Sequence, residues 1–285
     1  MDSFFNLMFE RSRKLRPSPT YPTYPPYHVG PYMEEFFLEK YLTSDLGINR
    51  ILIPILWTNC YLTHVGGIQE YLDALDKTKK YFTVSQHDDA IRERLPVDTI
   101  AFNGGGNGGG IPIPLICSPI PDVPTKERDI FCSFVGSVTH PIRNHMCSFL
   151  GNDPRFKIFG KIWEAGISKD KLDHFVDITA RSKFSLCPRG YGKTSFRLYE
   201  AIQLGAIPVY IYDDIWLPFT DFIDWDTFSV NIHFNDLGKL PDILNSYTDE
   251  RINHMRGVGK QVWEQYFSMD GMVNGIVKSL KEKYQ

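Results

Sequence analysis

Hydrophobic positions form two patterns that alternate along the chain: short apolar runs of strand length, and longer stretches with helical spacing. In the first half the predicted elements are helices over 33–42 and 67–79 and strands over 50–56 and 81–85, with a further helix toward residue 95. In the second half the predicted strands are 130–135, 156–159, 183–187, 207–212 and 228–232, separated by helices 142–150, 169–181 and 195–204. Such alternation predicts an α/β protein built from parallel β-α-β units.

Two segments interrupt these patterns. Residues 17–32 contain six prolines and four tyrosines, too proline-dense for a helix or a central strand. We expect an extended segment whose tyrosines pack on a surface or line a cleft. Residues 103–110 contain six glycines, which predicts a loop, either a lid over a cleft or an unstructured connector.

The proline-rich stretch 112–127 predicts a crossing between two lobes. We expect an N-terminal lobe over residues 1–125 and a C-terminal lobe over 126–258. A C-terminal helix of about 259–285 is expected to pack back onto the first lobe.

Composition narrows the class of protein. With 285 residues, 42% of them hydrophobic, the chain is long enough for two small lobes with buried cores. Its 31 basic and 34 acidic residues give a formal net charge of −3, whereas a nucleic-acid-binding protein usually carries a basic excess. We expect no nucleic acid among the partners.

The five cysteines lie far apart and form no C-x-x-C pair, so a disulfide framework or a zinc site is not expected. The longest apolar run, residues 51–57, is far shorter than a membrane span, and the N-terminus lacks the pattern of a signal peptide. These features predict a soluble protein of a cytoplasm, which would be a host cytoplasm if the protein is viral.

The densest group of chemically useful side chains lies in residues 182–209, which read SKFSLCPRGYGKTSFRLYEAIQLGAIPV. The pattern predicts a strand, a loop with Gly190 and Gly192, and a helix that begins at Thr194 or Ser195, either of which can cap it. The N-terminus of such a helix offers unpaired N–H groups and a partial positive charge, both of which suit a phosphate group.

Charged side chains surround the same loop. Arg189, Lys193 and Arg197 supply three cations there, and Tyr191 lies between the two glycines. Glu200 follows Arg197 by three residues, so both project from one face of the predicted helix, where a carboxylate suits the hydroxyls of a ribose. The group predicts a nucleotide-diphosphate site, and the alternative is a polar loop with surface cations.

These residues carry a resemblance to a known family. The stretch 182–209 resembles the exostosin-like family, glycosyltransferase family 47, whose segment has the form S-K-F-C-L-C-P-x-G-x-x-x-x-S-x-R-L-x-E-A-I-x-x-G-C-I-P-V. Ser185 and Ala206 stand where the family usually has cysteines. Weaker similarity continues upstream over the segments 81–88 and 131–143, and residues 216–219 and 224–225 downstream also fit. The resemblance covers residues 50–235 and is strong over 182–225.

The resemblance implies a GT-B fold, in which two Rossmann-like lobes with parallel sheets face a central cleft. It further implies a nucleotide sugar on the C-terminal lobe, an acceptor on the N-terminal lobe, and inversion at the anomeric carbon. The UDP-sugar is then a substrate, and no cofactor or metal is expected. Asp224-Trp225-Asp226 spells a D-x-D sequence, which holds a metal in another transferase fold, but here we interpret it as structural.

An inverting transfer needs a general base on the acceptor side of the cleft. His87 and Asp88 follow the predicted strand 81–85, so either is a candidate base, with the other or Asp89 orienting it. The alternative interpretation is a helix-capping aspartate beside a partly exposed histidine.

Further donor contacts are predicted around the same cleft. Arg143 follows the Gly136-Ser137 turn of the second lobe, and we expect it either to reach the diphosphate or to form a surface salt bridge. Asp213 and Asp214 end the following strand and are expected near the sugar hydroxyls.

The predicted function is an inverting glycosyltransferase that moves a sugar from a UDP-sugar, with UDP-xylose favoured, to a hydroxyl group of a glycan acceptor. One alternative is a non-catalytic glycan-binding protein that uses the tyrosines of 21–32 as sugar-stacking platforms. Another is a kinase-like enzyme, because Gly192-Lys193-Thr194 matches the end of a Walker A loop, although Cys187 stands where that motif needs glycine. The oligomeric state, the acceptor and the linkage are not indicated by the sequence.

Overall fold

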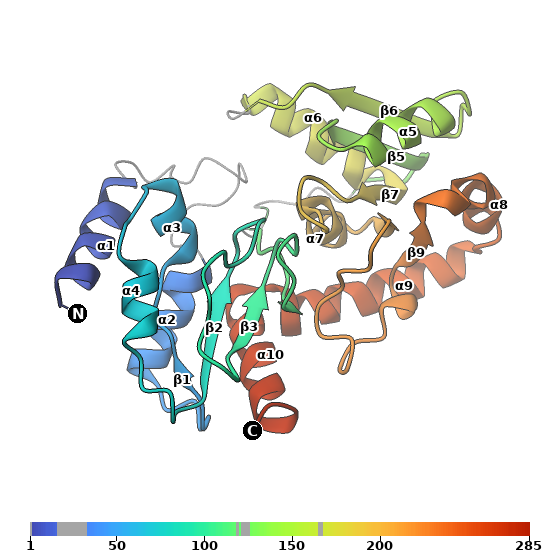
Figure 1. Cartoon of the computed structure of the whole chain (residues 1–285). Helices are drawn as coiled ribbons and strands as arrows, with labels where there is room; N and C mark the ends of the chain where they lie inside the picture. The colour runs from blue at the N-terminus through green and yellow to red at the C-terminus, as the bar shows by residue number, and fades with distance from the viewer. Residues whose placement is uncertain (1, 16–32, 118–119, 121–125, 165–167) are drawn as a thin grey trace.

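The computed structural model describes residues 2–15, 33–117, 120, 126–164 and 168–285. Each half of the chain forms its own parallel sheet, and helices pack around both (Figure 1). Two such lobes confirm the predicted α/β fold of GT-B type. The tyrosine-rich stretch 17–32 and part of the predicted crossing lie outside the described residues.

The sheet of the first lobe has four parallel strands in chain order: β1 (Ile51–Leu52), β2 (Tyr81–Ser85), β3 (Ile100–Asn103) and β4 (Ile111–Pro112). Its helices are α1 (Asp2–Leu15), α2 (Met33–Thr43), α3 (Trp57–Leu62) and α4 (Ile68–Asp73). The C-terminal helix α10 (Met269–Glu282) also packs here, against α2. Arg50, which precedes β1, donates a hydrogen bond of 2.6 Å from Nε to the carbonyl oxygen of Tyr284.

Two sequence predictions in this lobe are wrong. The expected strand over 50–56 is only β1, because residues 53–56 belong to no strand and α3 begins at Trp57. The helix expected toward residue 95 does not form, because the chain turns at His87–Ala90 instead. Ala90 donates from its backbone N–H to the His87 carbonyl at 3.0 Å and has a φ of 56°, which no α-helix tolerates.

The sheet of the second lobe has five parallel strands in the order β6-β5-β7-β8-β9. In chain order the elements are β5 (Ile130–Ser137), α5 (Pro141–Leu150), β6 (Phe156–Lys161), α6 (Lys169–Ala180), β7 (Ser182–Pro188), α7 (Phe196–Gln203), β8 (Ile207–Tyr212), β9 (Val230–His233), α8 (Leu240–Asn245) and α9 (Asp249–Val262). β5 lies inside the sheet, with β6 on one side and β7 on the other, so the strand order reverses there.

The two lobes share part of one hydrophobic core. Phe82 of β2 and Met272 of α10 belong to the same buried cluster as Tyr199 of α7 and Tyr210 of β8. The opposite face of the second sheet packs in a separate cluster against α5, α8 and α9. Because α7 faces the first lobe, the loop that precedes it lies where the two lobes meet.

Candidate active site

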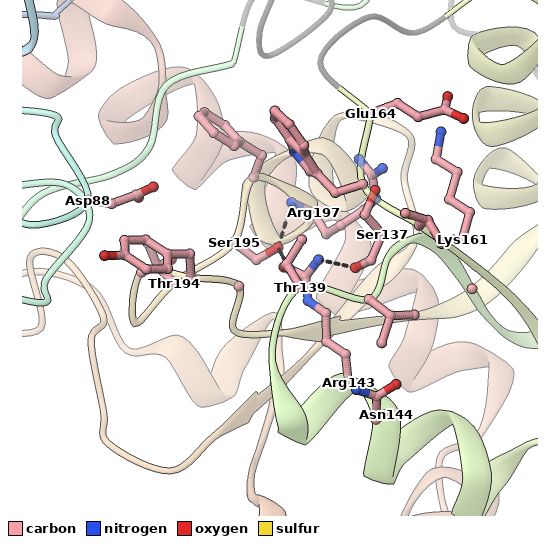
Figure 2. A pocket seen from close by; sticks show the side chains of 18 of the residues that line it. Asp88, Ser137, Thr139, Arg143, Asn144, Lys161, Glu164, Thr194, Ser195 and Arg197 are labelled. Atoms are coloured by element: carbon pink, nitrogen blue, oxygen red, sulfur yellow. Dashed lines mark hydrogen bonds between the residues drawn. The ribbon is translucent and has the colours of Figure 1, made fainter. Parts of the chain in front are cut away.

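The candidate site lies where β5 and β7 separate. The two strands pair only as far as Ser133 and Ser185, whereas each continues beyond that point beside its outer neighbour. In an open parallel sheet, ligands bind beyond the carboxyl ends of the strands where the order reverses. A cavity of about 1160 Å³ opens at this position, lined mainly by the second lobe and by Asp88 and Leu115 of the first (Figure 2).

The N-terminus of α7 faces this cavity. Ser195 has extended backbone angles, and its Oγ accepts a hydrogen bond from the N–H of Arg197 at 3.3 Å, so it caps the helix as predicted. Gly190 donates from its N–H to the Thr194 carbonyl at 3.0 Å and closes the preceding loop. The arrangement brings Gly190, Ser195 and the positive end of the helix to one wall of the cavity.

Arg143 holds the ends of the two separating strands. Its guanidinium donates to the carbonyl oxygens of Ser137, Arg189 and Pro188 at 2.7, 2.9 and 3.1 Å and to Ser195 Oγ at 3.2 Å. The side chain is 8% exposed, so the alternative of a surface salt bridge is wrong. Arg143 lines the cavity, and it fixes the helix cap that the cavity uses.

Arg197 and Glu200 form an ion pair inside the cavity wall. Arg197 Nε donates to the Val135 carbonyl at 2.6 Å, and its guanidinium lies 4.0 Å from the centroid of the Phe175 ring. Glu200 is 1% exposed, and no donor within the described part of the chain reaches its Oε1. A buried carboxylate oxygen without a partner is costly, so its position in a cavity wall indicates a ligand with hydroxyl groups.

Lys161 also lines the cavity, and sequence reasoning missed it. It ends β6 opposite Ser137 of β5. Burial and the neighbouring cations Lys171 and Arg197 lower its pKa, while Glu164 acts in the opposite direction. Among the residues that the structure describes, none forms an ion pair with Lys161, so its charge is available to an anion. The one signal in the sequence was its position just after a predicted strand.

Arg189 and Lys193 were expected to hold a diphosphate, but neither lines the cavity. Arg189 Nη1 lies 2.8 and 3.1 Å from the two carboxylate oxygens of Asp213. Lys193 Nζ lies 2.5 Å from Asp214 Oδ2 and 5.5 Å from the centroid of the Trp216 ring. Both cations are paired with carboxylates that follow β8, so these pairs fasten the loop to the sheet. Asp213 and Asp214 do not line the cavity either, and their contact with a sugar stays a prediction.

Of the two candidate bases, only Asp88 lines the cavity. Burial raises the pKa of its carboxyl to about 6, and the charge of Asp89 adds to this effect. The His87 ring instead lies edge-on to Tyr61 at 5.0 Å between centroids, and its Nδ1 accepts from the Asp89 N–H at 3.3 Å. Burial lowers the pKa of His87.

The glycine-rich loop 103–110 is ordered and forms the seam between the lobes, so the alternative of an unstructured connector is wrong. Lys193 donates from its N–H to the Gly105 carbonyl at 2.7 Å, and Trp216 Nε1 donates to the Gly104 carbonyl at 3.1 Å. A Cβ on Gly105 would lie 2.1 Å from Asp88 Cα, which explains the need for glycine. The seam therefore sets the position of Asp88 against the second lobe.

Both aspartates of the D-x-D sequence make local hydrogen bonds. Asp224 accepts from the N–H of Asp226 at 3.1 Å and caps a short 3-10 helix, and Asp226 accepts from Asn231 Nδ2 at 2.8 Å.

In the described ranges, no three His, Cys, Asp or Glu side chains lie close enough together to hold a metal ion. None of the described helices is long and apolar enough to cross a bilayer.

Comparison with known proteins places this architecture in a family. The Exostosin GT47 domain matches residues 104–247, half of the chain, and the chain belongs to this family. It is 35% identical over 132 residues to the probable glucuronoxylan glucuronosyltransferase IRX7 of Arabidopsis thaliana, a match that covers 42% of this chain and 28% of that protein. It is 42% identical over 141 residues to the probable glucuronosyltransferase GUT1 of Oryza sativa subsp. japonica, covering 45% of this chain and 32% of that protein. The chain thus spans about a third of the length of these relatives.

Solved structures with a similar arrangement include the pneumococcal O-GlcNAc transferase GtfA in complex with UDP and GlcNAc. It is 14% identical with a TM-score of 0.39, over 78% of this chain and 47% of that one. TarM is 10% identical with a TM-score of 0.43, over 76% of this chain and 53% of that one.

Proposed function

We propose that the chain is a glycosyltransferase that moves a sugar from a UDP-sugar to a hydroxyl group of a glycan acceptor, with inversion at the anomeric carbon. The observation that carries the proposal is the unpartnered Glu200 Oε1, buried beside Arg197 in the cavity at the N-terminus of α7. Membership of the exostosin GT47 family and the names of the relatives support it.

In this proposal the second lobe binds the donor. The N–H groups at the start of α7 and Arg197 hold the diphosphate, and Lys161 adds positive charge on the side away from Asp88. Arg143 also lines the cavity, but its guanidinium donates to backbone carbonyls and to Ser195. Glu200 accepts hydrogen bonds from the ribose hydroxyls. Arg143 is a positioning residue, since it holds the Ser195 cap and the two strand ends.

Asp88 acts as the general base from the first lobe. Its carboxylate takes the proton from the acceptor hydroxyl while that oxygen attacks the anomeric carbon. The bond from the anomeric carbon to the diphosphate oxygen breaks, and UDP leaves with the electron pair. Attack from the face opposite the leaving group inverts the configuration. A pKa of about 6 keeps Asp88 ionised near neutral pH and still makes it a better proton acceptor than an ordinary aspartate.

We propose that side chains and the helix end neutralise the charge of the leaving diphosphate without a metal. Activity measured with EDTA is then expected to match activity with added magnesium or manganese. Full loss of turnover in EDTA, restored by either metal, would contradict this part of the proposal.

The donor sugar distinguishes two versions of the proposal. The sequence favours UDP-xylose, whereas two relatives are named as glucuronosyltransferases, which favours UDP-glucuronic acid. A panel of UDP-sugars, scored by UDP release and by product anomeric configuration, tests both versions. Thermal stabilisation by UDP without turnover of any donor would instead indicate a binding protein, and the absence of both would make the transferase proposal wrong.

A further inference from the structure

The cavity has two different ends. Asp88 lies at one end, Lys161 and Glu164 lie at the other, and Ser195 and Arg197 lie between them (Figure 2). A donor whose diphosphate lies at the start of α7 and whose sugar lies toward Asp88 therefore extends its nucleoside toward the segment that follows β6. This orientation rests on the proposed function.

That segment carries an exposed tryptophan. Trp163 lines the cavity and is 51% exposed, and Ile162 beside it is 87% exposed. Trp57, Trp216 and Trp225, by contrast, are at most 5% exposed. Water contact with an indole ring of this size is unfavourable, and ligand cavities are lined mainly by apolar and aromatic side chains, so an exposed tryptophan in the cavity wall is a candidate contact for a ligand.

The surroundings of the Trp163 ring differ from those of the other aromatic side chains. Within the described residues, no ring stacks on it and no cation lies over it, whereas several other aromatic side chains of the chain make such contacts. Tyr191 is another exposed aromatic at the cavity, but its hydroxyl is bound to Asp89, at the Asp88 end. Phe196 also lines the cavity but is only partly exposed, so Trp163 is the exposed aromatic side chain at the nucleoside end.

We infer that Trp163 is the platform on which the nucleobase of the donor stacks. Bases stack on aromatic side chains without sequence-specific hydrogen bonds, and indole offers the largest ring surface among the side chains. The polar groups near α7 then fix the diphosphate and ribose, while Trp163 binds the part of the donor that is common to all UDP-sugars. Trp163 contributes to nucleotide affinity and is remote from the base Asp88.

The experiment compares UDP with inorganic pyrophosphate as ligands of the full chain. UDP is expected to quench part of the tryptophan fluorescence of the wild type and of a Trp263→Phe control, and to leave Trp163→Phe unquenched. Trp163→Ala is expected to weaken UDP binding about tenfold or more, the range found for base stacking, and to change pyrophosphate binding less than about twofold. Trp163→Phe keeps an aromatic ring and is expected to retain most of the UDP affinity.

Three outcomes overturn the inference, and they are distinguishable. If UDP binds Trp163→Ala as tightly as the wild type, the stacking role is wrong and the transferase proposal stands. If the wild type binds no UDP at all, the proposed function fails and the inference fails with it. Thermal melts show whether Trp163→Ala is folded, and equal weakening of UDP and pyrophosphate binding would indicate a distorted site and contradict the stacking role.

Discussion

The carboxylate of Asp88 lies against the backbone of Gly192, and the two residues belong to different lobes. A Cβ on Gly192 would lie 2.8 Å from Asp88 Oδ1 and 2.7 Å from the Gly105 carbonyl oxygen, which is closer than Cβ contacts in proteins. The candidate base therefore depends on a glycine in the loop that precedes α7. The loop that precedes α7 and the candidate base Asp88 are therefore packed against each other at the seam.

Replacing this glycine tests the relationship. We expect Gly192→Ala to lower the free energy of unfolding by ~1–3 kcal/mol and to reduce transfer, because the added methyl group must displace Asp88 or the seam loop. Urea unfolding and initial rates measure the two effects.

The matched control is Gly257→Ala in α9, where a Cβ would meet no atom within 4 Å. Alanine in the middle of an exposed helix is expected to raise the stability by up to ~1 kcal/mol. If Gly192→Ala and the wild type had equal stability and activity, the contact between Gly192 and Asp88 would not be as close as the structure shows.

The pKa of Asp88 predicts a pH profile. A base must be ionised to accept a proton, so kcat/KM is expected to fall about tenfold per pH unit below a pKa of about 6. Asp88→Asn is expected to lower kcat ~10²–10⁴-fold. His87→Gln separates the two candidates, because it should keep the acid limb of the profile. Loss of that limb in His87→Gln, with activity retained in Asp88→Asn, would assign the base to His87.

The raised pKa of Asp88 also makes the stability of the folded state depend on pH. The folded state holds the Asp88 proton up to about pH 6, whereas the ordinary value is 3.8, so this group's favourable contribution is present at low pH and lost as pH rises through about 6. Asp88→Asn is therefore expected to melt at a higher temperature than the wild type at pH 7 and at nearly the same temperature at pH 4. A lower melting temperature for the variant at pH 7 would contradict burial as the cause.

Local sequence signals predicted the elements that hold the site. Alternating strands and helices indicated the parallel sheets, and Ser195 was a correct candidate for the cap of α7. The position of Asp88 after β2 placed it at the cleft only once the resemblance supplied two lobes. These features depend on residues that are neighbours in the chain, which is why periodicity and capping rules detect them.

Pairings between distant segments were not predictable in this way. Strand order decides that β6 lies beside β5, and this order brings Lys161 into the cavity. Likewise, local patterns do not show that Arg189 and Lys193 form ion pairs with Asp213 and Asp214, which follow β8. Hydrophobic periodicity does not encode which strands are neighbours or which charges meet across them.

Lys161 lines the cavity and Lys193 does not, so the two lysines are expected to contribute differently to UDP binding. Lys161→Met is expected to weaken UDP binding about tenfold or more, because it removes a charge that lines the cavity. Lys193→Met is expected to change UDP binding less than about threefold, since Lys193 is paired with Asp214 outside the cavity. Calorimetric titration with UDP measures both affinities. If Lys193→Met weakened UDP binding more than Lys161→Met, the sequence-based prediction that Lys193 holds the diphosphate would be correct.

Arg143 links stability to the donor site, and its removal should impair both. Its guanidinium donates hydrogen bonds to three backbone carbonyls and to Ser195 Oγ. A buried polar group that loses its hydrogen-bond partner costs ~1–3 kcal/mol. Arg143→Met is therefore expected to lower the free energy of unfolding by ~3 kcal/mol or more and to weaken UDP binding through the displaced cap. The control Arg155→Met removes a surface pair with Asp153 and should cost less than ~1 kcal/mol. If Arg143→Met weakened UDP binding with no loss of stability, its guanidinium would contact the diphosphate itself and would not act as a positioning residue.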